Sequence, residues 1–229
     1  MSESLPERPA TARAVPRLLA VSAGRVAARG EDPRFDAWLD ELASARVEAV
    51  QVREKHLDDR RLLEVVLRAR SRLPATTLLL VNGRADIALA GEADGVHLPS
   101  SGLPVAALRR RWGRELWIGR STHSVDEVIA ARDDGADYVT FGPVYPTPGK
   151  AAYGPPPGLA GLRQAAATGL PVLALGGVGP EHLAEIAAAG AHGAAGIRAF
   201  HEPSSLKNLV GRAHEVFHQN ADSVPGDGR

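Results

Sequence analysis

The sequence has no cysteine, which excludes disulfide bonds and thiolate chemistry. It also has no excess charge of either sign, because Lys+Arg and Asp+Glu number 27 each. No overall basic field therefore attracts nucleic acid or a membrane surface. No apolar run approaches the ~18 residues of a membrane-spanning helix, and no secretory segment is recognisable. These absences predict a cytoplasmic protein that binds neither nucleic acid nor membranes.

Apolar segments alternate with stretches of helical spacing over most of the 229 residues, 44% of which are hydrophobic. Helical spacing is seen, for example, at Phe35, Trp38 and Leu39. The apolar segments are residues 18–22, 49–54, 77–82, 95–99, 117–122, 138–144, 171–177 and 193–198. Eight strand-then-helix units in a chain of roughly 200–250 residues are typical of a closed barrel.

We therefore expect an α/β protein, a single (β/α)8 TIM barrel over residues 17–219, with disordered tails at 1–16 and 220–229. An open doubly wound sheet is the alternative. No G-x-G-x-x-G motif follows the first predicted strand to support that alternative.

The stretch 117–150 shows how such a fold would build a site. A predicted strand ends in Ser121, Thr122 and His123, a helix follows over 125–134, and a second strand opens into a loop with Thr147 and Lys150. Parallel strands of one unit end on the same face of the sheet. His123 and Lys150 are therefore predicted to lie close together.

Polar residues follow the other predicted strands at the same ends, where active sites of these barrels lie. Many of them are cationic although the whole chain is neutral, which indicates an anionic small-molecule ligand. The set is Gln51, Arg53, Lys55, Asn82, Arg84, His97, Ser100, Ser121, Thr122, His123, Thr147, Lys150, Gly176, Gly177 and Arg198.

A glycine pair, Gly176 and Gly177, ends the seventh predicted strand, and a glycine-rich strand at 193–198 follows. Glycine allows backbone N–H groups to approach a ligand, and the loops after strands seven and eight are the usual phosphate site of these barrels. The ligand is therefore predicted to bind through a phosphate monoester group. The alternative is that the two glycines only make a tight turn.

Several motifs in register resemble the thiamine phosphate synthase/TenI superfamily over residues 18–200. They are VQVREK at 50–55, LVNGRADIAL at 80–89, ADGVHL at 93–98, IGRSTHSVDE at 118–127, GADYVTFGPVYPTPGK at 135–150 and PVLALGGVGPEHL at 171–183. The resemblance implies one of two activities. The synthase joins a pyrimidine pyrophosphate to a thiazole phosphate using magnesium, whereas a TenI-type tautomerase aromatises a carboxythiazole phosphate without metal.

Two positions bear on this choice. In the synthase pattern, aspartates that hold magnesium follow strands three and four, and this sequence has Gly83 and Gly102 there. Glycine offers no side-chain ligand to magnesium. The segments 82–84 and 118–124 also look TenI-like, whereas Gln51, Arg53 and Lys55 match the synthase motif. Because the missing carboxylates count for more than the retained cations, we predict the tautomerase, which needs no cofactor. Magnesium is expected only for the synthase alternative.

On this resemblance His123 is the acid/base, since imidazole exchanges protons near neutral pH. Lys150 would bind the substrate carboxylate or orient the ring. The backbone of Gly177, Ile197 and Arg198 would hold the phosphate. The remaining predicted substrate contacts are Gln51, Arg53, Lys55, Asn82, Ser121, Thr147 and Gly176.

Two other classes stay open. One is a non-catalytic regulator that binds a thiazole or thiamine phosphate in the same pocket. The other is a different phosphosugar barrel enzyme, which would need two opposed carboxylates that the strand ends do not provide. The resemblance also implies a homodimer.

Overall fold

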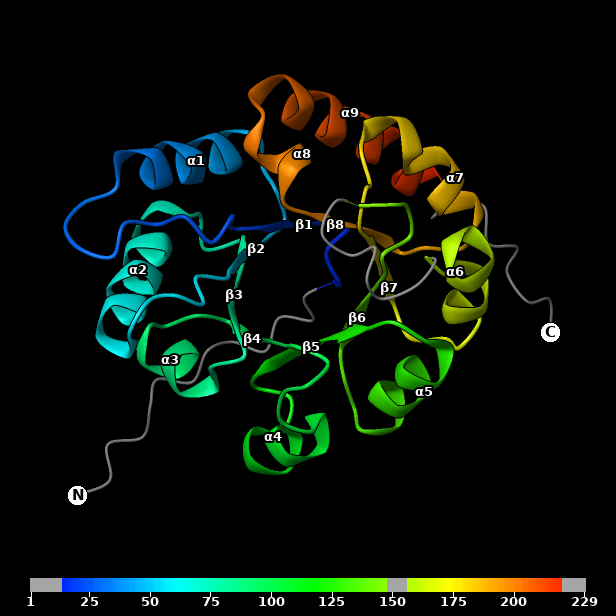
Figure 1. The fold of residues 1–229 in the computed structure, drawn as a ribbon, viewed down its shortest axis with the longest axis horizontal. Helices are drawn as coiled ribbons and strands as arrows, with labels where there is room; N and C mark the ends of the chain where they lie inside the picture. The colour runs from blue at the N-terminus through cyan, green and yellow to red at the C-terminus, as the bar shows by residue number, and fades with distance from the viewer. Residues whose placement is uncertain (1–13, 148–155, 220–229) are drawn as a thin grey trace.

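The computed structural model describes residues 14–147 and 156–219, and in it eight parallel strands form one closed barrel (Figure 1). Each strand pairs with its sequence neighbour, and β1 pairs with β8, where Leu18 lies opposite Ala194. The strands are β1 (Leu18–Val21), β2 (Ala49–Val52), β3 (Leu78–Asn82), β4 (Gly95–Leu98), β5 (Trp117–Thr122), β6 (Tyr138–Phe141), β7 (Val172–Leu175) and β8 (Gly193–Gly196). The predicted (β/α)8 barrel is confirmed.

Helices surround the strands on the outside of the barrel (Figure 1). They are α1 (Pro33–Ser44), α2 (Asp59–Arg72), α3 (Ala85–Ala90), α4 (Val105–Trp112), α5 (Val125–Asp133), α6 (Gly158–Ala166), the 3-10 helix η2 (Pro180–His182), α7 (Leu183–Ala188), α8 (Arg198–His201) and α9 (Pro203–Gln219). Over residues 14–147 and 156–219, no helix combines the length and apolarity needed to cross a membrane.

Helix starts follow from local side chains. Asp32 accepts hydrogen bonds from the backbone of Arg34 and Phe35 at the start of α1, and Ser124 accepts one from Glu127 at the start of α5. Such caps satisfy backbone N–H groups that have no partner within the helix. The site residues at the strand ends are thus connected to helices with defined starting points.

Successive side chains of each strand face opposite sides, so the barrel has two cores. Ile118 and Phe141 pack outward in the cluster between strands and helices. Leu19, Leu80 and Leu173 belong to a separate, smaller cluster of buried residues. That inner cluster fills the barrel, so a substrate has access only to its ends.

The chain before β1 covers one of these ends. Val15, which the sequence placed in the N-terminal tail, packs on the inner cluster, and its carbonyl oxygen lies 2.9 Å from Nε2 of His192. Residues 1–13 and 220–229 of the predicted tails lie outside the described residues. The opposite, C-terminal end of the strands carries the predicted site.

Candidate functional site

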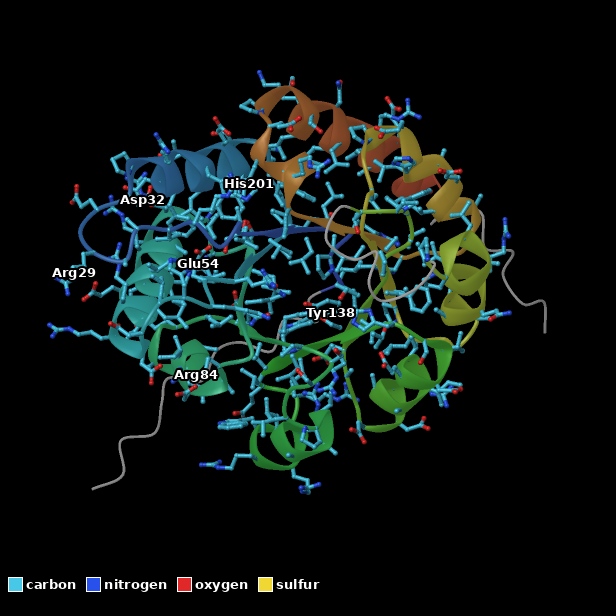
Figure 2. All side chains as sticks on the ribbon, viewed as in Figure 1. Arg29, Asp32, Glu54, Arg84, Tyr138 and His201 are labelled. Carbon is cyan, nitrogen blue, oxygen red and sulfur yellow. The ribbon has the colours of Figure 1, made fainter. Side chains whose placement is uncertain are left out.

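The loop after β2 is held by a buried carboxylate, Glu54, which is only 3% exposed. One of its oxygens accepts hydrogen bonds from the Ser22 hydroxyl at 2.5 Å and the Gly24 N–H at 3.0 Å. The other accepts from the Val26 N–H at 3.0 Å. Sequence reasoning missed Glu54, although a carboxylate between two cations in an apolar segment was a signal for it. Its contacts tie the loop after β1 to the loop after β2. Figure 2 labels Glu54.

Arg53 and Lys55 lie on either side of Glu54 and lack a carboxylate partner in the part of the chain that the structure describes. The β2 ladder ends before Arg53, whose N–H donates to the Ser22 hydroxyl instead. Gln51 is buried at the end of β2. A cavity of about 300 Å³ opens here and is lined by Val52, Glu54, Lys55, Leu57, Leu62, Asn82, Gly83 and Arg84. Lys55 is thus available to an anionic ligand in this cavity, and Arg53 lies two residues before it in the same loop.

Arg84 corrects the predicted set of cations. Its guanidinium forms a two-pronged ion pair with Asp86, at 2.9 and 2.6 Å, and a further pair with Asp59 of α2. The hydrogen bonds to Asp86 and then to Asp59 raise the pKa of Arg84. Its charge is paired with two carboxylates of α2 and α3, so its contribution to the cationic mouth is smaller than predicted.

His123 directly follows β5 and is exposed. Its Nδ1 lies 2.5 Å from the carbonyl oxygen of Gly142, and its backbone N–H donates to Glu127. A carbonyl only accepts, so Nδ1 carries the proton and Nε2 of the neutral ring keeps its lone pair. The ring therefore has the tautomer that a proton acceptor requires.

Ser121 lies half-buried at the end of β5, and its hydroxyl is 2.9 Å from Nε2 of His97. His97 is buried inside the barrel, where its Nδ1 is 2.9 Å from the hydroxyl of Tyr138. Burial lowers the pKa of His97 to about 3, and the nearby charge of Arg120 adds to this. The sequence ranked His97 below His123, and the structure places it against a predicted ligand residue.

The glycine pair after β7 has left-handed backbone, with φ of +95° at Gly176 and +70° at Gly177. A Cβ at Gly176 would lie 2.7 Å from Pro143, and one at Gly177 would lie 2.7 Å from Cβ of Tyr145. The pair therefore makes a tight turn and also packs against the loop after β6. Both effects require glycine, whether or not a phosphate binds there.

The remaining predicted residues lie at or beyond the strand ends. Ile197 is 39% exposed after β8, and Arg198 is exposed at the first position of α8. The Thr147 hydroxyl oxygen is buried without a hydrogen-bond partner among the described residues, so its predicted contact with substrate stays a prediction. Lys150 lies outside the described residues, so its predicted proximity to His123 stays a prediction.

The described residues do not fit a magnesium site. Among residues 14–147 and 156–219, no three His, Cys, Asp or Glu side chains are grouped to hold a metal. Gly83 and Gly102 stand at the two positions where the resemblance places carboxylates, and a Cβ at Gly102 would lie 3.0 Å from the Pro99 carbonyl oxygen. Glu54 already accepts three hydrogen bonds within its own loops.

The closed (β/α)8 barrel, with two cations and a glycine turn at the C-terminal ends of its strands, places the chain among the TIM barrels, whose active sites lie at that end. Within this class, residues 24–200 match the family described as thiamine monophosphate synthase, and the chain belongs to that family of thiamine biosynthesis.

Named relatives agree with the family. A thiamine-phosphate synthase of Anaeromyxobacter dehalogenans is 42% identical over 204 residues, which cover 86% of this chain and 92% of that protein. One from Moorella thermoacetica is 39% identical over 73% of this chain and 81% of its own length. The solved thiamine phosphate pyrophosphorylase of Pyrococcus furiosus has a TM-score of 0.75 at 28% identity, covering 87% of this chain and 96% of that structure. These names correspond to the transferase alternative of the sequence analysis and not to the tautomerase.

Proposed function

We infer that the chain is a transferase that joins a pyrimidine pyrophosphate to a thiazole phosphate, giving thiamine phosphate. The observation that carries this proposal is that the mouth has two separate sets of groups suited to anions. Arg53 and Lys55 follow β2, whereas the turn at Gly176 and Gly177 and the start of α8 follow β7 and β8. In the barrel, β1 separates β2 from β8. Two phosphorylated substrates need two such sets for phosphate groups, whereas a tautomerase substrate has a single phosphate and a carboxylate that Lys150 is predicted to bind.

The two sets divide the reaction between them. The lone pair of the thiazole nitrogen forms a bond to the methylene carbon of the pyrimidine, and the bond from that carbon to pyrophosphate breaks with its electrons going to the leaving oxygen. Arg53 and Lys55 stabilise the negative charge that develops on pyrophosphate. The loops after β7 and β8 hold the thiazole phosphate, which orients the attacking nitrogen. Gln51 of β2 and Asn82 at the end of β3 would contact the pyrimidine.

The names of the relatives support this proposal. The similarity extends over most of their length, with 92% of the Anaeromyxobacter dehalogenans synthase covered. Because glycine at positions 83 and 102 offers no side-chain ligand to magnesium, we propose that the cations of the loop after β2 neutralise the pyrophosphate. The transfer is therefore proposed to need no protein-bound metal.

The tautomerase is the second candidate, and one observation favours it. His123 is held as the Nδ1–H tautomer by Gly142, which leaves Nε2 to take a proton from carbon without a metal. Ser121, Thr147 and Lys150 would then contact the carboxythiazole. A regulator that binds the same compounds without turnover is the remaining outcome of the test.

The test is an NMR assay of the purified protein offered carboxythiazole phosphate alone and, separately, thiazole phosphate together with the pyrimidine pyrophosphate. Each arm is run after chelation and again with added magnesium. Thiamine phosphate formed in the two-substrate arm supports the transferase, and Arg53→Gln should raise KM for the pyrophosphate substrate about tenfold or more. Conversion of the thiazole tautomer alone, lost in His123→Asn, would replace the transferase by the tautomerase.

Binding without either product would indicate the regulator. The homodimer and the cytoplasmic location also stay proposals. Sedimentation velocity of the full chain decides the first, and cell fractionation decides the second.

A further inference from the structure

A chain of three hydrogen-bonded side chains runs from the inside of the barrel to its mouth. Tyr138 on β6 is fully buried, and its hydroxyl lies 2.9 Å from Nδ1 of His97 on β4. Nε2 of His97 lies 2.9 Å from the hydroxyl of Ser121, at the end of β5. Figure 2 shows Tyr138 near the centre of the ring of strands. Three strands thus contribute to one connection that ends at a predicted ligand residue.

A glycine on the middle strand makes room for this connection. A Cβ at Gly119 would lie 2.2 Å from Cζ of Tyr138 and 2.6 Å from Nδ1 of His97. Distances under 3.0 Å to a Cβ require the neighbours to move. The backbone of β5 at this point is therefore compatible with the Tyr138–His97 pair only because residue 119 has no side chain.

The direction of each hydrogen bond follows from the partners. In the described part of the chain, the Tyr138 hydroxyl has the His97 ring as its hydrogen-bond partner, so the phenol donates to the lone pair of Nδ1. Burial lowers the pKa of His97 and raises that of Tyr138, so both are neutral at neutral pH.

A neutral ring with its lone pair at Nδ1 has its proton at Nε2, which donates to Ser121. Thr140 is a second neighbour of that nitrogen, with its hydroxyl oxygen at 3.4 Å. Because Ser121 accepts from His97, its own proton is free to point toward the mouth.

We propose that Tyr138 and His97 are positioning residues that fix the Ser121 hydroxyl as a donor to the pyrophosphate group of the substrate. The inference rests on the proposed function in so far as a phosphorylated substrate occupies the mouth. Without the phenol, the ring can adopt the Nδ1–H tautomer. Nε2 then accepts from Ser121, and the serine proton turns away from the ligand.

The first test reads the tautomer without any ligand. Nitrogen-15 NMR of the full chain should show His97 protonated at Nε2 and unprotonated at Nδ1. Tyr138→Phe should give a mixture of both tautomers. A wild-type ring protonated at Nδ1 would overturn the inference.

The second test is calorimetric binding of inorganic pyrophosphate, with thermal unfolding used to confirm that each variant is folded. Ser121→Ala should weaken binding about tenfold, as expected for a lost hydrogen bond to a charged group. Tyr138→Phe should weaken it roughly threefold or more in the wild-type background and not at all in the Ser121→Ala background. Thr140→Val, a matched change beside the same ring, should stay within about twofold of wild type.

Equal losses for Tyr138→Phe in both backgrounds would assign Tyr138 a purely structural role and overturn the inference. Pyrophosphate that fails to bind the wild-type chain would overturn it as well. A second outcome is that Tyr138→Phe weakens pyrophosphate binding only when Ser121 is present while the substrates give no thiamine phosphate. In that case the proposed transferase fails and the positioning of Ser121 stands. If thiamine phosphate forms and the two changes are additive, only the positioning fails.

Discussion

The carboxylate of Glu54 accepts a hydrogen bond from the hydroxyl of Ser22, with the two oxygens 2.5 Å apart. The same carboxylate accepts from the backbone of Gly24 and Val26, so one side chain joins the loops after β1 and β2. Arg53 and Lys55 flank it in sequence. The position of the two proposed pyrophosphate-binding cations therefore depends on a residue that is itself held by hydrogen bonds to the loop after β1.

Glu54→Gln should destabilise the fold and weaken substrate binding. The amide nitrogen of glutamine cannot accept a hydrogen bond, so a buried donor is left unpaired at a cost of about 1–3 kcal/mol. The melting temperature should fall by roughly 2–4 °C for each kcal/mol in a chain of this size. Calorimetry measures this fall, and Glu64→Gln on the exposed face of α2 is the control. An unchanged melting temperature would contradict the role given to Glu54.

Gly177→Ala should destabilise the protein more than Gly30→Ala does. Both glycines have nearly the same left-handed backbone, with φ of +70° and +71°, which costs any L-residue about 1–2 kcal/mol. Only at Gly177 would the new Cβ meet a neighbour, Cβ of Tyr145 at 2.7 Å. The difference between the two variants in urea unfolding isolates this contact. Equal effects would show that backbone conformation alone selects glycine there.

Two arginines that follow neighbouring strands should respond differently to removal of charge. Arg53→Gln removes a cation that has no carboxylate partner among the described residues, so KM for the pyrimidine pyrophosphate should rise about tenfold or more. Arg84→Gln removes a charge already paired with Asp59 and Asp86, so the same KM should change less than about threefold. Steady-state kinetics of the two variants compare them directly. A larger effect for Arg84 would return it to the set of ligand-binding cations.

The protein should become less stable as the pH is lowered, in a range above the usual pKa values of carboxylates. Burial holds the pKa of His97 at about 3 in the folded protein, whereas the unfolded value is about 6.5. The unfolded chain therefore binds more protons between these values, and the free energy of unfolding decreases as pH falls below about 6.5.

Replacing His97 by glutamine should reduce the slope of melting temperature against pH between about 4.5 and 6. One proton corresponds to roughly 1.4 kcal/mol per pH unit, which sets the largest change expected. Burial lowers the pKa of His192 and His201 in the same direction, so part of the slope remains in the variant. Identical slopes for wild type and variant would contradict the lowered pKa of His97.

The strands were predictable because buried apolar runs have few alternatives, and the predicted strand at 117–122 coincides with β5. Other predicted strands extend too far. The second was predicted to reach Glu54, but the ladder ends at Val52 because the N–H of Arg53 binds a side chain from the loop after β1. That partner lies 31 residues earlier in the sequence, so no local pattern indicates it.

The site was predictable to the extent that it depends on strand ends. Ser121, Asn82 and Gln51 lie at or near the ends where the barrel places them. The charge state of the mouth was less predictable, because Arg84 pairs with Asp59, 25 residues away, as well as with the nearby Asp86. The hydrogen bond between His97 and Tyr138 joins positions 41 residues apart and follows from the register of three strands.

The pairing of β1 with β8 has a consequence for how the protein is made. Residues of the first strand remain without one neighbour until the last strand leaves the ribosome. The cations after β2 are translated early and the loop after β8 late, so the mouth is incomplete on any shorter nascent chain. A ribosome stalled before residue 193 should therefore carry a chain that does not retain thiazole phosphate.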